Sequence, residues 1–309
     1  MSLLSNERRK VTASEAGGMP LTQTADDVMF HDIASSAFIG HCSNSACRSG
    51  WLHLFRKRTR PVFEGGWTCS PDCTEARVQF SVRRELEGWQ QVQETHRHRI
   101  PLGLLMLERG WITSQQLRRA IEAQRGSGNL RIGEWLVEQG AIDEVQIARG
   151  LSLQWGCPVL SVSNSGMAGT SEVLPRLFVE GFGALPLKVP SGKIVYLGFE
   201  QSLDAALALS VKRMAGIRVE SGIIPSSVYA DAVDRLRNQA FPALQLAETA
   251  SDLAAAHVLA RSIERARPIA SRLVRVHEWL WLRMLLQSPG GTLPISSRIS
   301  DVVCRIGAF

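Results

Sequence analysis

Four of the six cysteines stand in two close pairs, and thiols at such spacings bind metal ions. Four residues separate Cys42 from Cys47, and three separate Cys69 from Cys73. Structural zinc sites separate paired ligands by two to four residues in the same way. Four thiolates would complete the tetrahedral shell of the metal and leave no position for a substrate. The spacing therefore predicts one structural zinc ion bound by these four cysteines.

Two other chemistries compete for these residues. His41 and His53 lie near the first pair in the sequence, and each is an alternative zinc ligand in place of a cysteine. Disulfides are the second alternative, but we predict a cytoplasmic protein, and that compartment keeps thiols reduced. Cys157 and Cys304 have no partner at ligand spacing, so we expect them to be small buried side chains.

The residues around the second cysteine pair indicate how the thiols would be positioned. The run WTCSPDC, from Trp67 to Cys73, leads into a predicted helix that Ser70 or Asp72 can cap. It resembles the second half of a treble-clef finger. The free N–H groups at the start of a helix stabilise thiolate charge. Because residues 38–95 contain few apolar side chains, a bound metal would also hold this segment together.

A gapless internal repeat occupies the next part of the chain. Residues 101–124 align on residues 131–154, with these identical pairs: Gly103/Gly133, Glu108/Glu138, Gly110/Gly140, Ile112/Ile142, Gln116/Gln146, Arg119/Arg149 and Gln124/Gln154. Each unit reads as a short helix, a glycine that ends it, and an N-cap, Thr113 or Asp143, that begins a second amphipathic helix. The repeat predicts two copies of one helix-turn-helix.

Both units carry one motif: Arg-Leu-Gly, a later glycine, spaced apolar residues and a final glutamine. The second unit has it from Arg131 to Gln154, and the first has it from Leu102 to Gln124 with Pro101 at the arginine position. The two units resemble the tandem motif in the N-terminal domain of type II secretion and type IV pilus ATPases. The resemblance extends over about residues 100–240 and implies a small α/β subdomain after the repeat.

In that family the tandem motif binds cyclic di-GMP, so the resemblance implies a half-site in each unit. Its residues are Arg131, Ile132, Gly133 and Leu136 in the second unit, and Leu102, Gly103 and Met106 in the first. Pro101 removes one arginine, and the loss of a charge-assisted contact costs about 1.5–3 kcal/mol. Arg99 is a candidate replacement. The alternative is that the two units only pack as a helical docking module.

These features together predict an α+β, multidomain chain with five parts. They are a disordered lead-in (1–37), a small treble-clef-like zinc module (38–95), the duplicated helix-turn-helix module (96–160), a small α/β subdomain (161–240) and a C-terminal helix and strand region (241–309).

In the C-terminal region, residues 250–267 predict an amphipathic helix that Pro268 ends. Residues 272–285 alternate in a way that favours a strand, with a helix as the alternative. The strand would place Trp279, Trp281 and Arg283 on one face. That face would either bind a partner or be covered by the preceding helix.

Charge and composition exclude some classes of function. The net charge is +6, but only five of the 35 basic residues are lysines, and the arginines are spread along the chain. This excess of arginine over lysine is typical of a GC-rich genome, so it disfavours nucleic acid as the partner. The run HLFRKRTR (53–60) is the best candidate for a contact with a polyanion. Arg283 interrupts the most apolar stretch, and no signal-peptide pattern begins the chain. We predict a cytoplasmic protein without a transmembrane segment.

The residues do not form the patterns of an enzyme. The Gly192-Lys193 pair is followed by Ile194, so it is not a phosphate-binding loop. No Ser-His-Asp set, carboxylate pair or open metal site stands out. We predict a non-enzymatic regulatory or adaptor protein with structural zinc, cyclic di-GMP as candidate ligand and a secretion or pilus protein as partner. The alternatives are a docking scaffold that no longer binds nucleotide and a zinc-finger nucleic-acid-binding protein.

Overall fold

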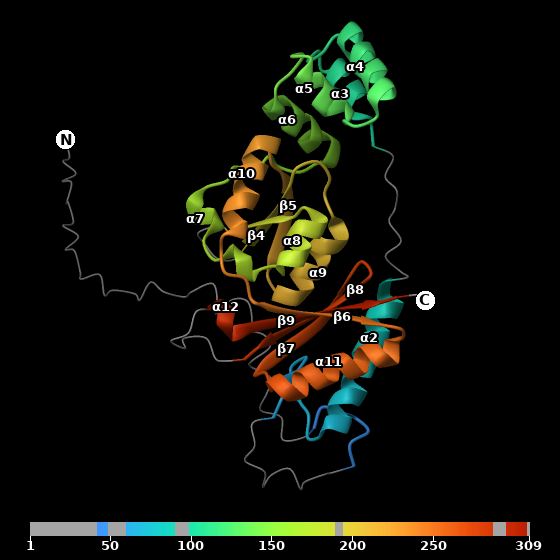
Figure 1. Ribbon diagram of the computed structural model, residues 1–309, viewed down its shortest axis with the longest axis vertical. Helices are drawn as coiled ribbons and strands as arrows, with labels where there is room; N and C mark the ends of the chain where they lie inside the picture. The colour runs from blue at the N-terminus through green and yellow to red at the C-terminus, as the bar shows by residue number, and fades with distance from the viewer. Residues whose placement is uncertain (1–41, 49–59, 90–98, 189–193, 287–294, 308–309) are drawn as a thin grey trace, which may run out of the picture.

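The repeat folds into four helices at one end of the molecule (Figure 1). The computed structural model describes residues 42–48, 60–89, 99–188, 194–286 and 295–307, so the expected lead-in, residues 1–37, lies outside the described residues. The helices of the repeat are α3 (Leu102–Glu108), α4 (Ser114–Ser127), α5 (Ile132–Glu138) and α6 (Glu144–Trp155). The duplicated helix-turn-helix is therefore confirmed.

The identical residues of the two units explain why they fold alike. Thr113 and Asp143 cap α4 and α6, and each accepts a hydrogen bond from the backbone N–H three residues on. The side chains of Gln116 and Gln146 accept from the backbone of the cap residue in return, which completes two capping boxes. The glycines that end the first helix of each unit have a φ of +68° or +65°, where a side chain would strain the backbone.

The next subdomain pairs a small sheet with helices. Its elements are α7 (Asn164–Met167), the 3-10 turn η2 (Thr170–Glu172), α8 (Arg176–Phe182), β3 (Leu185–Lys188), β4 (Ile194–Phe199), α9 (Ala205–Ala215), β5 (Arg218–Ile223) and α10 (Ser226–Arg237). The strand order is β3-β4-β5, with β3 antiparallel and β5 parallel to β4.

The C-terminal region forms a second sheet. Its elements are β6 (Ala243–Thr249), α11 (Asp252–Ala266), β7 (Ala270–Val276), β8 (Trp279–Leu285), α12 (Ile295–Arg298) and β9 (Ile299–Ile306). The strand order is β6-β9-β8-β7, and only β6 and β9 run parallel. The helix expected over residues 250–267 is confirmed.

The single strand expected over residues 272–285 is wrong, because the segment forms the two strands of a hairpin. The chain turns at His277, which has a φ of +51°, and Glu278. The turn shifts the alternation by one residue, so Trp281 lies opposite Val274 on the same face of the sheet. Nothing in the residue types marks this turn, because it contains neither glycine nor proline.

The cysteine segment packs against this second sheet. Its elements are the hairpin β1 (Val62–Phe63) and β2 (Gly66–Trp67) and the long helix α2 (Pro71–Trp89). The backbone N–H groups of Val62 and Glu64 donate to the carbonyls of Pro268 and Ser271, at 2.9 and 2.8 Å. The hairpin therefore lies along the β7 edge, and α2 lies beside α11 on one face of the sheet (Figure 1).

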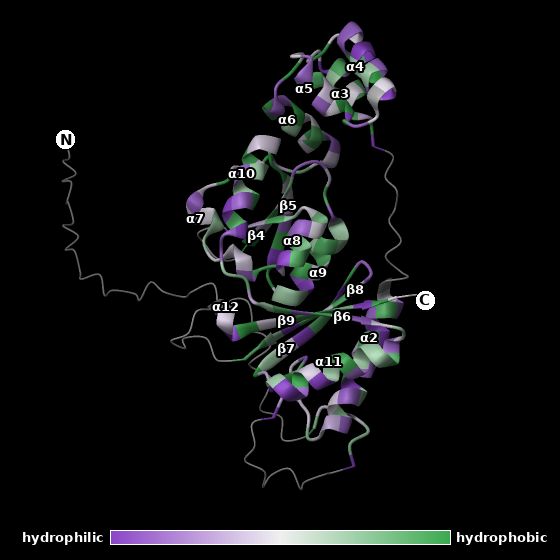
Figure 2. Cartoon of the chain, viewed as in Figure 1, coloured by the Kyte–Doolittle hydropathy of each residue, from purple (hydrophilic) through white to green (hydrophobic). Residues whose placement is uncertain are grey.

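Both faces of the C-terminal sheet are covered. Leu280 and Leu282 pack with Val78 and Val82 of α2 and with α11, and these two helices alternate hydrophobic and hydrophilic residues (Figure 2). On the other face, Trp281 is fully buried against the core of the α/β subdomain. The expected partner surface of Trp281 and Arg283 is therefore wrong, and the covering element is not the preceding helix but the α/β subdomain, because the preceding helix covers the opposite face.

Candidate functional sites

The four paired cysteines lie together in space. The sulfur atoms of Cys42, Cys47, Cys69 and Cys73 are all within 4.8 Å of one another. The Cys69 sulfur is 3.5 Å from the sulfurs of both Cys47 and Cys73. Four sulfurs at the zinc–sulfur distance of about 2.3 Å form a tetrahedron with edges of roughly 3.8 Å. The donor set and its spacing thus fit one tetrahedral metal ion.

Local hydrogen bonds hold the first pair in a tight turn. The backbone N–H of Cys47 donates to the carbonyl of Asn44 at 3.0 Å, and that of Ala46 donates to the Asn44 side chain at 3.1 Å. The N–H of Ser43 donates to the carbonyl of Trp67 at 2.9 Å and ties this turn to the hairpin. A Cβ at Gly66 would lie 2.4 Å from that of Ser43, so this contact requires glycine.

The second pair stands at the start of α2. The hydroxyl of Ser70 accepts from the backbone N–H of Cys73 at 3.3 Å, which confirms the predicted cap. Burial, followed by hydrogen bonds with the other three thiols, raises the pKa of Cys69 to about 12. His41 and His53, the substitute ligands, lie outside the described residues, as does the basic run except Arg60. The expected burial of Cys304 is confirmed, whereas Cys157 is half-buried.

The repeat places its motif residues in two different environments. Met106 and Leu136 are fully buried in the core of the module. Gly103 and Gly133 are buried too, and a Cβ on them would lie 2.5 Å from Leu117 and 3.2 Å from Ile147. These motif residues therefore pack the helices together. Arg131 is exposed, and Leu102 and Ile132 are half-buried, so these three are the predicted half-site residues that a ligand can reach.

The two units are related by an approximate two-fold axis. The Gln124 side chain donates to the carbonyl of Leu130 at 3.3 Å, and the Gln154 side chain donates to that of Ile100 at 2.7 Å. Each glutamine thus binds the residue that immediately precedes the motif of the other unit. The helices pack in the same reciprocal way: the second helix of each unit packs on the first helix of the other, α4 on α5 and α6 on α3. Such reciprocal contacts define an isologous pair.

An arginine lies at the start of the second motif, whereas in the first unit the nearest preceding arginine is two residues before the motif. Arg131 begins the second motif, and its backbone N–H donates to the Glu134 carboxylate at 2.6 Å. Pro101 has the equivalent place in the first unit, with a similar extended backbone. The Arg99 guanidinium lies 3.2 Å from the ring centroid of Trp155. The candidate replacement is therefore held over an aromatic ring, a contact that the spacing of the two residues in the sequence did not indicate.

Two ionic networks join the parts of the molecule; the first is buried, and the second has a buried carboxylate with partly exposed arginines. The Arg283 guanidinium binds both oxygens of Asp301 at 2.8 Å and the carbonyls of Glu172 and Val173 at 2.6 and 3.0 Å. The Trp281 indole N–H donates to the same carboxylate at 2.9 Å. Both charged side chains have almost no exposure. They connect β8 and β9 to the turn before α8.

The second network is centred on Glu85 of α2. Its carboxylate accepts from both terminal nitrogens of Arg213, on α9, at 2.5 and 2.8 Å, and from Arg84 and the backbone of Arg275. Burial would raise the pKa of Glu85, but hydrogen bonds and charge attraction from Arg213 and Arg84 outweigh it and lower the pKa. The cysteine segment is thereby tied to the α/β subdomain. The sequence does not indicate this contact, because it joins residues 128 positions apart.

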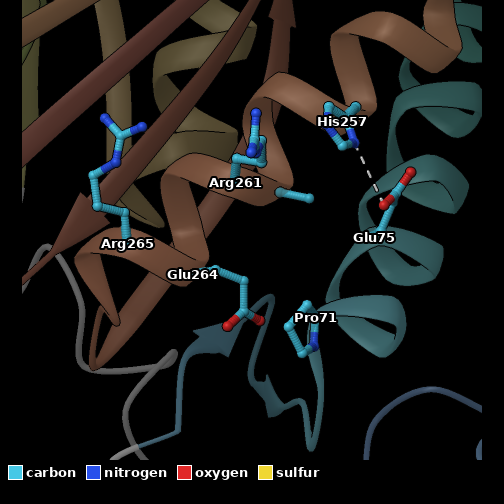
Figure 3. Close-up of a pocket in the computed structure, with 7 residues that line it drawn as sticks. Pro71, Glu75, His257, Arg261, Glu264 and Arg265 are labelled. Atoms are coloured by element: carbon cyan, nitrogen blue, oxygen red, sulfur yellow. Dashed lines mark ion pairs between the residues drawn. The ribbon is translucent and has the colours of Figure 1, made fainter.

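A groove between α2 and α11 is lined mostly by charged side chains. Pro71 and Glu75 of α2 line it together with residues of α11 (Figure 3). His257 lies 3.5 Å from the Glu75 carboxylate, and Thr74 donates to Glu264. The side chains that line the groove include no serine, cysteine or threonine that could act as a nucleophile.

No helix in the described part of the chain has both the length and the apolar character needed to cross a membrane.

The chain is similar to secretion and pilus ATPases over less than half of its length. No protein-family model matches it. It is 26% identical over 145 residues to the type IV pilus assembly ATPase PilB of Myxococcus xanthus (strain DK1622), which is 47% of this chain and 25% of PilB. The chain therefore spans about a quarter of the length of this curated relative, and the matched part excludes the catalytic ATPase domain.

Two solved structures are similar to a comparable share of the chain. One is MshE with c-di-GMP, at 26% identity, 45% of this chain, 99% of that chain and a TM-score of 0.38. Another is the N-terminal domain of XpsE, at 18% identity, 43% of this chain, 92% of that chain and a TM-score of 0.33. Among the proteins to which the chain is similar, PilB is thus a type IV pilus assembly ATPase, and the XpsE structure is that of an N-terminal domain.

Proposed function

We propose that this chain is a non-enzymatic regulatory or adaptor protein whose secretion-ATPase-like domain binds cyclic di-GMP. The observation that carries the proposal is the reciprocal pairing of the two motifs, in which Gln124 and Gln154 exchange equivalent hydrogen bonds. Cyclic di-GMP is itself two-fold symmetric, so two equivalent half-sites related by a two-fold axis suit it. MshE, the similar protein solved with this nucleotide, supports the same ligand.

The accessible motif residues define the contacts that we propose. Arg131 is the exposed cation of the second half-site and is able to bind a guanine edge or a phosphate oxygen. Leu102 and Ile132 offer their exposed edges to the bases. The buried members of the predicted site, Gly103, Gly133, Met106 and Leu136, act by setting the helix positions. Because Pro101 replaces the second arginine, we expect weaker binding than two arginines would give.

Calorimetric titration of the full chain with cyclic di-GMP tests this function. We expect one nucleotide binding event per pair of motifs and a large loss of affinity in Arg131→Ala. Pro101→Arg restores the second arginine on a backbone that already has the required extended conformation, so we expect it to raise affinity by about tenfold or more. Arg118→Ala, an exposed arginine of α4 outside the motif positions, is the matched control.

No measurable heat with either the wild-type chain or Pro101→Arg would favour the alternative, a docking scaffold without nucleotide. Burial of most motif residues is the specific observation in favour of that alternative. For the nucleic-acid alternative, residues 53–59 of the basic run lie outside the described residues, and Arg60 stacks over Trp67 at 4.1 Å.

We also propose that Cys42, Cys47, Cys69 and Cys73 hold one structural zinc ion in a treble-clef-like arrangement. The turn at Asn44, the β1–β2 hairpin and the start of α2 are the parts that this arrangement needs. With four thiolate ligands the metal has no open position, so its role is to connect these parts. The cytoplasmic location expected from the sequence remains a prediction.

A further inference from the structure

A hollow between α9, β5 and β7 has a strong excess of positive charge. Its volume is about 620 Å³. Four cationic side chains and one carboxylate line it: Lys212, Arg213, Arg218, Arg272 and Glu220. Glu220 pairs with Arg218 at 2.7 Å, and Arg213 is turned toward the buried Glu85. Lys212 is exposed and has no ion-pair partner among the described residues. The hollow therefore attracts a negatively charged group.

Part of the lining of the same hollow is apolar. Ile217 and Val219 are half-buried, and Leu209 is 44% exposed although it is a large aliphatic residue. No aromatic side chain lines the hollow, so it has no platform on which a nucleic-acid base could stack. A ligand that suits both parts of the hollow carries acidic groups together with aliphatic ones.

The outer edge of β5, which is paired at Ile223 but not at Val219, indicates the shape of that ligand. β5 is the last strand of its sheet, and Ile223 turns its backbone outward, since it pairs with Pro158 and Leu160 at 3.0 and 2.7 Å. Alternate residues of a strand face the same side, so the backbone of Val219 faces outward too. No hydrogen bond joins it to another described segment there. An extended peptide could continue the sheet at this point.

We propose that this hollow binds an extended segment of a partner protein that carries both acidic and aliphatic residues. Its carboxylates would pair with Lys212 and Arg218, and its aliphatic side chains would pack against Leu209 and Ile217. The partner backbone would pair with Val219. This interface is separate from the motif residues of the repeat, so it can serve the partner while the repeat serves the nucleotide.

Fluorescence anisotropy of the full chain with a labelled eight-residue peptide of alternating glutamate and valine tests the proposal. We expect saturable binding that weakens as salt rises, because the contacts are exposed charges. Lys212→Glu combined with Arg218→Glu should lower the affinity at least tenfold, whereas Arg118→Glu, the same charge change in α4, should leave it within about twofold. A proline at the central valine of the peptide should also weaken binding, because proline removes a backbone donor.

Three outcomes would overturn the proposal. Equal binding of a lysine–valine peptide would exclude charge recognition. Unchanged affinity in the double variant would place the peptide elsewhere. Tighter binding of a single-stranded oligonucleotide or of anionic lipid vesicles than of the acidic peptide would assign the hollow to another class of partner. The far-UV circular dichroism of the double variant shows that it is folded, and both substitutions are at exposed positions.

Discussion

At the level of single residues, the buried Arg283–Asp301 ion pair is stabilised by the hydrogen bonds that surround it. Arg283 and Asp301 face each other across β8 and β9, and two backbone carbonyls take the remaining terminal nitrogen of the guanidinium. Removing one member of such a pair costs about 3–5 kcal/mol, since the other charge is left buried. The arginine that interrupts the most apolar stretch of the sequence is thus a structural connection between two parts of the chain.

Because of Glu85, the free energy of unfolding depends on pH. Its pKa is lower in the folded chain than in the unfolded chain, so the unfolded chain binds more protons as the pH falls. The stabilisation is fully present above the unfolded pKa, near 4.3, and is lost as the pH falls through the folded pKa. Urea unfolding between pH 7 and pH 3 should show this loss.

The matched variant is Glu85→Gln, which keeps the shape of the side chain and removes its titration. We expect it to be less stable than the wild type at pH 7 and to lose less stability on acidification. Equal slopes in the two proteins would contradict the role of this carboxylate.

At the scale of elements, the repeat was predictable because its signals are local. Gln116 and Gln146 complete capping boxes within four residues of the caps, and the sequence shows both. The turn at His277 could not be predicted in this way, because a non-glycine residue takes the left-handed conformation there. Its ring nitrogen lies 2.6 Å from the carboxylate of Asp204, a contact from another part of the chain.

Two glycines of the repeat should respond to alanine in opposite directions. In Gly103→Ala the new methyl group would lie 2.5 Å from Leu117, so we expect a loss of about 1–3 kcal/mol from overpacking. Gly126, inside α4, has open space where a methyl group would lie and an ordinary helical backbone, so Gly126→Ala should stabilise by up to about 1 kcal/mol. Thermal or urea unfolding of both variants measures this difference. Equal effects would contradict the close packing of α3 on α4.

At the scale of the whole molecule, the parts predicted as separate segments share their cores. Trp281 packs edge-on against Phe178 at 5.5 Å, and Phe63 joins the core beneath α11. The types of these residues indicated burial, but the sequence could not show which element would cover them. The clustering of the four cysteines, by contrast, was predictable from spacing, because short-range geometry brings each pair together.

Because the cysteine segment and the C-terminal sheet share one core, we expect removal of the metal to affect β7 as well. We expect about one zinc per chain, and its loss in Cys47→Ser should loosen the β1–β2 hairpin that bonds to Pro268 and Ser271. Hydrogen exchange along β7 should then speed up, although β7 contains no ligand. Cys157→Ser, a half-buried cysteine outside the cluster, should keep both the metal and the protection. A metal-free chain with full protection of β7 would contradict the zinc proposal.

We propose that the two equivalent motifs form one paired site for cyclic di-GMP, and hydrogen–deuterium exchange of the full chain with and without the nucleotide measures this pairing. We expect protection to rise together in peptides covering 100–106 and 130–136, and we expect Arg131→Ala to abolish both changes. Protection in only one unit, or confined to residues outside the repeat, would contradict it.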